Sequence, residues 1–162
     1  MTRLAVALAR LFALPLLAFA QDPPLRIAIA GLAHGHVSGF LNAAAKRPDA
    51  RIVAIFDADP ALVASYAKRY NLPADGQFTD LGKMLDTVKP EAVATFTSTY
   101  DHGMVVDAAA KRKVPVMMEK PLAVDMKHAH AIQQAAARAG IPVIVNYETA
   151  WYRSHGEIWN TM

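Results

Sequence analysis

The sequence predicts an α/β fold in which helices cover both faces of a doubly wound parallel sheet. From residue 25 onward, short apolar runs rich in Val and Ile alternate with amphipathic segments of helical length, which is the pattern of repeated strand–helix–strand units. The apolar runs are nearly continuous, as expected for strands that are buried on both faces. With 162 residues, 54% of them hydrophobic and 19% charged, the chain is long enough for one globular domain of this kind.

Each element is predicted from its periodicity and from the residues that begin or end it. Pro60 suits the first turn of a helix, Asp59 and Asp80 are placed to cap helices, and Gly140 closes the last one. Strands are expected over 25–30, 51–56, 77–78, 92–97, 114–118 and 141–145, and helices over 36–46, 60–70, 81–88, 102–111 and 124–139. In a doubly wound sheet, ligands bind outside the carboxyl ends of the strands, where the strand order reverses. The residues that follow strands are therefore the candidates for function.

The turn after the first strand has the features of a phosphate-binding loop. It leads from a predicted strand into a predicted helix and reads Gly31-Leu32-Ala33-His34-Gly35-His36. Gly31 permits the tight turn, Gly35 leaves the backbone bare, and the helix N-terminus attracts pyrophosphate. The fingerprint G-x-G-x-x-G is matched only in part, because Ala33 takes its second glycine position and His36 its third. The loop and its context predict a Rossmann-type dinucleotide-binding domain.

A carboxylate at the end of the second strand extends this nucleotide site. Asp57 follows the loop by about twenty residues, at the place where a carboxylate holds the ribose hydroxyls of a dinucleotide. A carboxylate there repels a 2′-phosphate, and neither Ala58 nor Asp59 supplies a cation, so NAD is favoured over NADP. The alternative, that Asp57 and Asp59 only cap the following helix, stays open.

The histidines of the loop do not by themselves predict a metal site. His34 and His36 lie two residues apart at a helix start and have no obvious third ligand in the sequence. Capping of the loop or contact with the cofactor is the favoured role. His128 and His130, in the last predicted helix, are expected at the surface. The absence of cysteine excludes disulfides, thiolate catalysis and cysteine zinc sites.

The segment after the fifth strand carries a resemblance to a known family. It reads Met118-Glu119-Lys120-Pro121-Leu122-Ala123. A lysine at the carboxyl end of a strand faces the same crevice as the phosphate loop. Together with that loop, Glu-Lys-Pro resembles the signature of the glucose-fructose oxidoreductase, inositol dehydrogenase and MocA-like (Gfo/Idh/MocA) family, over about residues 25–151. Residues 95–99 with His102, and 146–148 with 151–152, are similar to that family's segments after the fourth and sixth strands.

This resemblance implies an NAD(P)-dependent oxidoreductase that transfers hydride at a carbon of a sugar, cyclitol or related hydroxyl compound. It implies that Lys120 is the catalytic residue, near the nicotinamide and the substrate hydroxyl. Thr97, His102 and Glu119 would then belong to the cofactor site with Lys120. From the residues alone, an ion pair of Lys120 with Glu119 ahead of a proline turn remains the alternative.

The family also sets an expectation for the domain organisation. Its members usually continue into a second α/β domain with most of the substrate contacts, whereas this sequence stops at Met162. We therefore expect residues 25–146 to form the dinucleotide-binding domain, and residues 147–162 to begin the connection to an absent C-terminal domain. On this expectation the chain alone binds cofactor and is not active by itself. His155 is expected to be an exposed residue of the connection.

Residues 1–20 have the pattern of a secretory signal peptide. Arg3 and Arg10 precede the apolar stretch 11–17, and small residues that signal peptidase reads follow at Ala18-Phe19-Ala20. Arg10 keeps the apolar run shorter than the roughly 20 residues that span a bilayer, which argues against the alternative of a membrane anchor. We expect cleavage before Gln21 and a periplasmic or extracellular protein with no stable membrane span.

Charge limits the partners that the sequence predicts. The net charge of +3 falls to about +1 when the two arginines of the leader are removed. The basic run Lys111-Arg112-Lys113 suits a solvated helix C-terminus, so no nucleic-acid partner is expected. A small-molecule substrate is expected, and a homo-oligomer is compatible with the sequence. Two alternatives to the enzyme stay open: an exported nucleotide-binding or sensing module without turnover, and a sugar-binding protein that uses the same crevice without cofactor.

Overall fold

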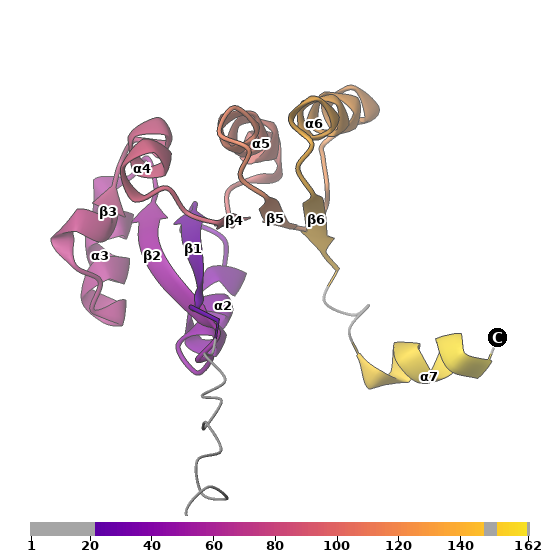
Figure 1. Cartoon of the computed structure of the whole chain (residues 1–162), viewed down its shortest axis with the longest axis horizontal. Helices are drawn as coiled ribbons and strands as arrows, with labels where there is room; N and C mark the ends of the chain where they lie inside the picture. Colours follow the sequence, from indigo (N-terminus) through magenta and orange to yellow (C-terminus); the bar gives the residue numbers. More distant parts are fainter. Residues whose placement is uncertain (1–21, 148–151, 162) are drawn as a thin grey trace, which may run out of the picture.

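The computed structural model describes residues 22–147 and 152–161, and a six-stranded parallel sheet lies at its centre (Figure 1). The strands are β1 (Leu25–Ala30), β2 (Ala50–Phe56), β3 (Gln77–Phe78), β4 (Ala92–Thr95), β5 (Val116–Glu119) and β6 (Val143–Asn146). The helices are α2 (His36–Ala44), α3 (Pro60–Tyr70), α4 (Leu81–Val88), α5 (His102–Ala110), α6 (Met126–Ala139) and α7 (Arg153–Thr161), with short 3-10 turns at Ala74–Gly76 and Thr99–Asp101. The strand order β3-β2-β1-β4-β5-β6 reverses between β1 and β4. The predicted doubly wound parallel sheet is confirmed.

The ends of β4, β5 and β6 differ from the prediction because neighbouring strands set them, and β6 continues one residue beyond its predicted end, to Asn146. β4 ends at Thr95 rather than at residue 97, because its last partners are Ala30 of β1 and Met118 of β5. β5 continues to Glu119, one residue beyond its predicted end, because Glu119 still pairs with Asn146 of β6. Glu119 therefore occupies the last position of a strand and not the loop that follows it.

Two strands begin two residues later than predicted, because the chain before each of them is still closing a helix. Val114 donates its N–H to the carbonyl of Ala109 at 3.0 Å, and Ile141 donates its N–H to the carbonyl of Ala136 at 3.1 Å. These bonds satisfy carbonyl groups at the ends of α5 and α6 that would otherwise lack partners. β5 and β6 start only after these closures.

Side-chain caps fix the starts of three helices. The Asp59 and Asp80 carboxylates accept backbone N–H groups in the first turns of α3 and α4 at 2.8 and 2.7 Å, as predicted, and each such cap contributes about 1 kcal/mol. The Asp125 carboxylate caps α6 in the same way. This cap was not predicted, and it is the reason that α6 begins at Met126 rather than at residue 124.

Two hydrophobic clusters hold the helices against the sheet, one on each face. On one face α4, α5 and α6 pack against strand residues that include Ala30, Val93 and Met118. On the other face α2 and α3 pack against residues that include Ile29 and Phe96. Figure 1 shows α5 and α6 side by side over β4, β5 and β6, with α2 on the opposite side of the sheet. Because both faces are packed, the loops at the carboxyl ends of the strands are held in fixed relative positions.

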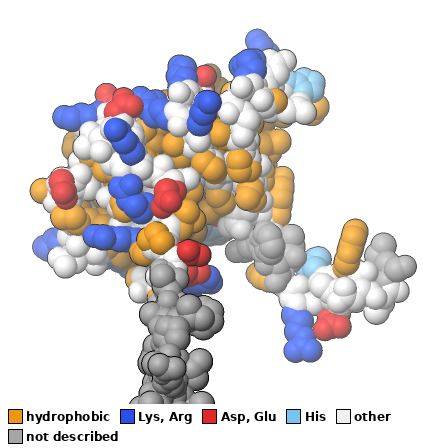
Figure 2. Space-filling view, viewed as in Figure 1, with side chains coloured by type: hydrophobic (Ala, Val, Ile, Leu, Met, Phe, Trp, Pro, Cys, Tyr) orange, Lys and Arg blue, Asp and Glu red, His pale blue; other side chains and the backbone are white. Residues whose placement is uncertain are grey.

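The α2 face of β5 and β6 is less covered than the rest of the sheet. The cluster under α2 and α3 takes only Met117 from β5 and no residue from β6, and Ile144, the β6 partner of Met117, is 53% exposed. Hydrophobic side chains reach the surface below α5 and α6 (Figure 2). Since side chains alternate along a strand, Glu119 and Asn146 point to the same face as Met117 and Ile144.

The prediction that His128 lies at the surface is wrong. His128 is half-buried between α6 and α5, and its Nε2 accepts the backbone N–H of Gly103 at 3.1 Å. A Cβ on Gly103 would lie 2.5 Å from that nitrogen, so the two helices approach closely because Gly103 has no side chain. His130 is exposed, as predicted.

The predicted leader, residues 1–20, lies outside the described residues, and so do residues 148–151 of the predicted connection. The described part of that connection is α7, which is exposed along its whole length. Its Trp159 is 78% exposed, and His155 is exposed, as predicted. Over the described ranges 22–147 and 152–161, no helix combines the length and the apolar character that a membrane crossing requires.

Candidate functional site

Gly31 makes the turn at the carboxyl end of β1. Its φ is +88°, a conformation that favours glycine, and an added Cβ would lie 2.5 Å from both the backbone nitrogen and Cγ2 of Thr97. Its N–H donates to the carbonyl of Phe56 in β2 at 2.7 Å. Both the backbone conformation and the space therefore require glycine at this position, which places the loop against the segments that follow β2 and β4.

The rest of the loop bends into the start of α2. Ala33 and Gly35 are exposed, and a Cβ on Gly35 would meet no atom within 4 Å, so the backbone there faces open space. Nδ1 of His34 accepts the N–H of His36 at 3.2 Å, and the carbonyl of His34 accepts the N–H of Val37 at 3.1 Å. His34 thus contacts the first turn of α2 through its ring and its carbonyl, which is compatible with capping, one of the two roles favoured for it. The α2 N-terminus, with its partial positive charge, lies at the carboxyl end of β1, where it favours an anion.

Asp57 ties the phosphate loop to the loop that follows β2. Its Oδ2 accepts the N–H of Leu32 at 2.7 Å, and its Oδ1 accepts the N–H of Asp59 at 2.9 Å. The direct cap of α3 is Asp59 and not Asp57. Asp57 is only half-buried, and each carboxylate oxygen has more than one lone pair, so it can still accept hydrogen bonds from a ligand's hydroxyl groups.

Glu119 brings the segment after β5 to the phosphate loop. Its side chain is buried, with 1% of the residue exposed. Its Oε1 accepts an N–H from the Asn146 side chain at 3.3 Å, and its Oε2 lies 3.2 Å from Nδ1 of His36. Although this second contact has the distance of an ion pair, Oε2 has no hydrogen-bond partner among the described residues. The predicted site residues His36 and Glu119 therefore meet across the crevice, with a buried carboxylate at their contact.

A pocket of about 380 Å³ opens beside this contact. Residues from α2, from the end of β4 and from the ends of β5 and β6 line it: Gly35, His36, Gly39, Phe40, Ala43, Phe96, Glu119 and Asn146. The sequence interpretation missed most of the residues from α2 and β4. A signal for them exists, because Gly39 and Ala43 are small residues four apart on one helix face and leave room above Phe96. The pocket thus combines apolar walls with one buried carboxylate and one amide.

The remaining predicted residues do not line this pocket. Lys120 is exposed, and its ammonium group has no ion-pair or hydrogen-bond partner within residues 22–147 and 152–161; its peptide bond to Pro121 is cis. The hydroxyl of Thr97 donates to the carbonyl of Ser98 at 3.2 Å. The alternative to a chemical role, an ion pair of Lys120 with Glu119, is absent from the described contacts.

His102 lies behind the Lys120 turn rather than in the pocket. It is 1% exposed, and its Nδ1 lies 3.3 Å from the carbonyl of Leu122, a pure acceptor, so Nδ1 carries the proton and donates. Burial lowers the pKa of His102, and the neighbouring His128 lowers it further. A neutral His102 therefore holds the backbone that follows Lys120, while the structure does not bring His102 to the pocket itself.

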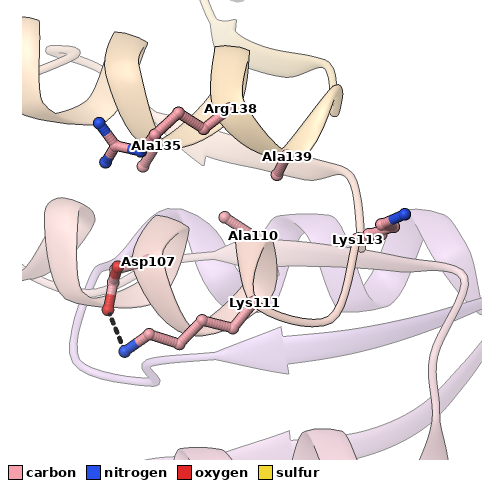
Figure 3. A pocket seen from close by; sticks show the side chains of 7 residues that line it. All are labelled: Asp107, Ala110, Lys111, Lys113, Ala135, Arg138 and Ala139. Carbon is pink, nitrogen blue, oxygen red and sulfur yellow. Dashed lines mark ion pairs between the residues drawn. The ribbon is translucent and has the colours of Figure 1, made fainter.

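A second groove, between α5 and α6, is lined in part by Lys111 and Lys113 of the basic run (Figure 3). Lys111 points toward Asp107 and forms an ion pair with it at 2.7 Å, and Arg112 pairs with Asp86 at 2.6 Å. The groove lies at the C-terminal ends of the two helices, which is the amino end of the sheet. It is therefore remote from the phosphate loop and is not part of the candidate site.

Comparison with known proteins agrees with this geometry. Residues 25–147 match the GFO_IDH_MocA model, which describes an oxidoreductase family with an NAD-binding Rossmann fold. The chain belongs to the Gfo/Idh/MocA family. The resemblance drawn from the phosphate loop and the Glu-Lys-Pro segment is confirmed, and with it the membership of this chain in a family of oxidoreductases.

Three relatives of this Gfo/Idh/MocA chain are each much longer than the part of them that it matches. D-apiose dehydrogenase of Paraburkholderia graminis is 28% identical over 102 residues, which are 63% of this chain and 27% of that protein. An oxidoreductase of Agrobacterium radiobacter, solved in complex with NAD+, L-tartaric acid and magnesium, has a TM-score of 0.72 at 24% identity, over 78% of this chain and 36% of its own. Apo scyllo-inositol dehydrogenase of Lactobacillus casei has a TM-score of 0.74 at 20% identity, over 85% and 40%. The chain therefore spans less than half the length of these relatives, and at these identities the two structures establish the fold alone.

Proposed function

We propose that the chain forms the NAD(H)-binding part of an oxidoreductase that acts on a sugar, cyclitol or related hydroxyl compound. The observation that carries the proposal is the contact between His36 of the phosphate loop and Glu119 of the Glu-Lys-Pro segment, 3.2 Å apart. It brings the predicted pyrophosphate end and the predicted reactive end of the site into one crevice, at the reversal of strand order where doubly wound folds bind their ligands. The relative named for D-apiose supports the substrate class.

The described residues fit a dinucleotide. The exposed backbone at Ala33 and Gly35 and the N-terminus of α2 would hold the pyrophosphate, and the half-buried Asp57 would hold the ribose hydroxyls. The pocket beside Glu119, with Phe96 as an apolar wall, would take the nicotinamide ring. When bound, NAD accepts the hydride. Since Asp57 repels a 2′-phosphate, NAD rather than NADP is the proposed cofactor.

Lys120 is the proposed proton carrier. It follows β5, its side chain is exposed, and its backbone is held in the turn that His102 supports through Leu122. In this position the neutral amine of Lys120 would take the proton of the substrate hydroxyl and become an ammonium group as the hydride leaves the neighbouring carbon, so that charge does not accumulate on the oxygen.

We also propose that a second domain supplies most of the substrate contacts. The α2 face of β5 and β6 presents the half-buried Met117 and the exposed Ile144, and α7 presents Trp159. Exposed apolar groups of this kind are ordinarily covered by another folded unit. Such a domain would align the substrate with Lys120.

The protein is further proposed to be exported. This rests on the leader pattern of residues 1–20 alone, with Arg3 and Arg10 before an apolar stretch and small residues at 18 and 20. The mature protein would begin at Gln21, and the cofactor site would work outside the cytoplasm.

NADH formation with a panel of sugars and cyclitols tests the proposed activity. The comparison is between this chain, a longer natural product of the same locus, and the Lys120→Ala and Lys127→Ala variants of each, Lys127 being an exposed lysine of α6. We expect the longer protein to turn over substrate, at a rate that falls by about 10²-fold or more in Lys120→Ala and is unchanged in Lys127→Ala. We expect no comparable turnover by the short chain, because alignment of the substrate by a second domain is worth roughly 7 to 11 kcal/mol. Turnover that does not depend on Lys120 would overturn the role of that residue, and robust turnover by the short chain would overturn the role of a second domain.

A further inference from the structure

The fold adds a third candidate ligand to the two histidines of the phosphate loop. His34, His36 and Glu119 each offer one ligand atom, and these atoms all lie within 4.8 Å of one another. The sequence offered no obvious third ligand, because Glu119 becomes a neighbour of the loop only through the packing of β1, β4 and β5 side by side. From this grouping we propose a binding site for a divalent transition-metal ion of the Zn²⁺ type, with His34, His36 and Glu119 as its protein ligands.

The spacing of the ligand atoms suits such an ion. Zn²⁺ binds imidazole nitrogen and carboxylate oxygen at about 2.0–2.2 Å, so two ligands of a tetrahedral site lie about 3.3 Å apart. Nδ1 of His36 and Oε2 of Glu119 lie 3.2 Å apart, and the His34 and His36 rings are in edge contact with centroids 4.7 Å apart. Two imidazoles with one carboxylate form a donor set that favours zinc-like ions over Mg²⁺ or Ca²⁺.

The buried carboxylate supplies an independent reason for a cation at this point. Glu119 is 1% exposed, and its Oε2 has no hydrogen-bond partner in the described part of the chain. A buried carboxylate oxygen without a partner is costly, and a bound cation removes that cost. The other oxygen is held by the Asn146 amide at 3.3 Å, the kind of supporting contact that orients metal ligands.

The site has a closed side and an open side. Glu119 closes it from the sheet, whereas the His36 side chain is 44% exposed and borders the pocket of about 380 Å³. Three protein ligands with an open position leave room for water or a further ligand on the metal. His34 is the weakest of the three, because its Nδ1 already accepts the His36 N–H at 3.2 Å and must give up that bond or bind through its other nitrogen.

Titration of the full, tag-free chain with Co²⁺ and Zn²⁺ in the absence of NAD tests this proposal separately from the proposed enzymatic function. We expect one ion per chain, with visible Co²⁺ absorption typical of low coordination number, and competition by Zn²⁺. Glu119→Gln and His36→Asn should each weaken binding by at least about tenfold, and His34→Asn should weaken it less. His130→Asn is the matched control, because His130 is exposed and belongs to a second His-x-His pair on α6.

Each outcome of the titration either supports or overturns the proposed metal site. Loss of binding in Glu119→Gln and His36→Asn, with wild-type far-UV circular dichroism and with binding unchanged in His130→Asn, supports the site. Should Glu119→Gln fail to fold, metal binding by the His36→Asn variant decides the test, because His36 is exposed. No binding by the wild-type chain, or equal binding by wild type and His36→Asn, overturns the proposal.

Discussion

Gly31 lies against Thr97 at the point where the strand order of the sheet reverses. A Cβ at position 31 would fall 2.5 Å from the Thr97 backbone nitrogen, and the φ of Gly31 is +88°. The phosphate loop and the segment after β4 are therefore fixed relative to each other by a contact that leaves no room for a side chain. The positions of the loop's backbone and side-chain groups in the crevice depend on this contact.

We predict that Gly31→Ala destabilises the domain by about 2 kcal/mol or more and abolishes NAD binding. A positive φ costs a non-glycine residue about 1–3 kcal/mol, and the Thr97 backbone must move in addition. Urea unfolding followed by circular dichroism measures the first effect, and calorimetry the second. In Gly39→Ala a Cβ would meet no atom within 4 Å, so this control should be as stable as wild type or more so; equal stability of Gly31→Ala and wild type would contradict the account.

The lowered pKa of His102 predicts how the free energy of unfolding depends on pH. Burial lowers its pKa in the folded state, whereas in the unfolded chain a histidine titrates near pH 6.5. Below about pH 6.5 the unfolded state therefore binds more protons than the folded state, and the free energy of unfolding falls as the pH falls. The stabilisation is fully present above that pH.

His102→Asn should flatten this dependence between about pH 7 and 5, because asparagine keeps a side-chain N–H for the Leu122 carbonyl and does not titrate. Unfolding free energies at several pH values for wild type, His102→Asn and the exposed His130→Asn provide the comparison. His130→Asn should keep the wild-type slope. The same slope in all three proteins would mean that His102 is not the group responsible.

The parts of the site that the sequence predicts are the local ones. Gly31 and Asp57 could be found because each follows a strand of clear apolar character, and a glycine turn into a helix is a short-range pattern. The Asp59 and Asp80 caps, which the structure confirms, were accessible for the same reason. The roles of residues at the start or end of a helix or strand can be predicted from the sequence without knowing which elements pack against that helix or strand.

The parts that the sequence does not predict depend on neighbours far along the chain. The end of β5 at Glu119 is set by pairing with β6, and the approach of Glu119 to His36 is set by the order of the strands. His128 looks like a surface residue in a polar stretch of helix, but Gly103 lets α5 approach it. Each of these contacts joins two elements whose adjacency only the assembled sheet defines.

Export makes a prediction that is independent of the site. Expression with residues 1–20 should give exported protein whose mass corresponds to an N-terminus at Gln21, and expression without them should give none outside the cytoplasm. Mass spectrometry of the exported fraction identifies the cleavage position. An uncleaved chain retained in the membrane fraction would favour the anchor instead.

The central claim is that the crevice at the carboxyl ends of β1, β2 and β5 holds NAD, with Asp57 on its ribose. Calorimetry of NAD and NADP with the chain from Gln21 onward tests it most directly, with Asp57→Asn as the paired variant because asparagine keeps an acceptor for the Leu32 N–H. We predict one NAD per chain, bound at least about tenfold more tightly than NADP, and a loss of that preference in Asp57→Asn, since a charged hydrogen bond is worth about 1.5–3 kcal/mol. No binding of NAD, or NADP bound as tightly as NAD by the wild-type chain, would contradict the account.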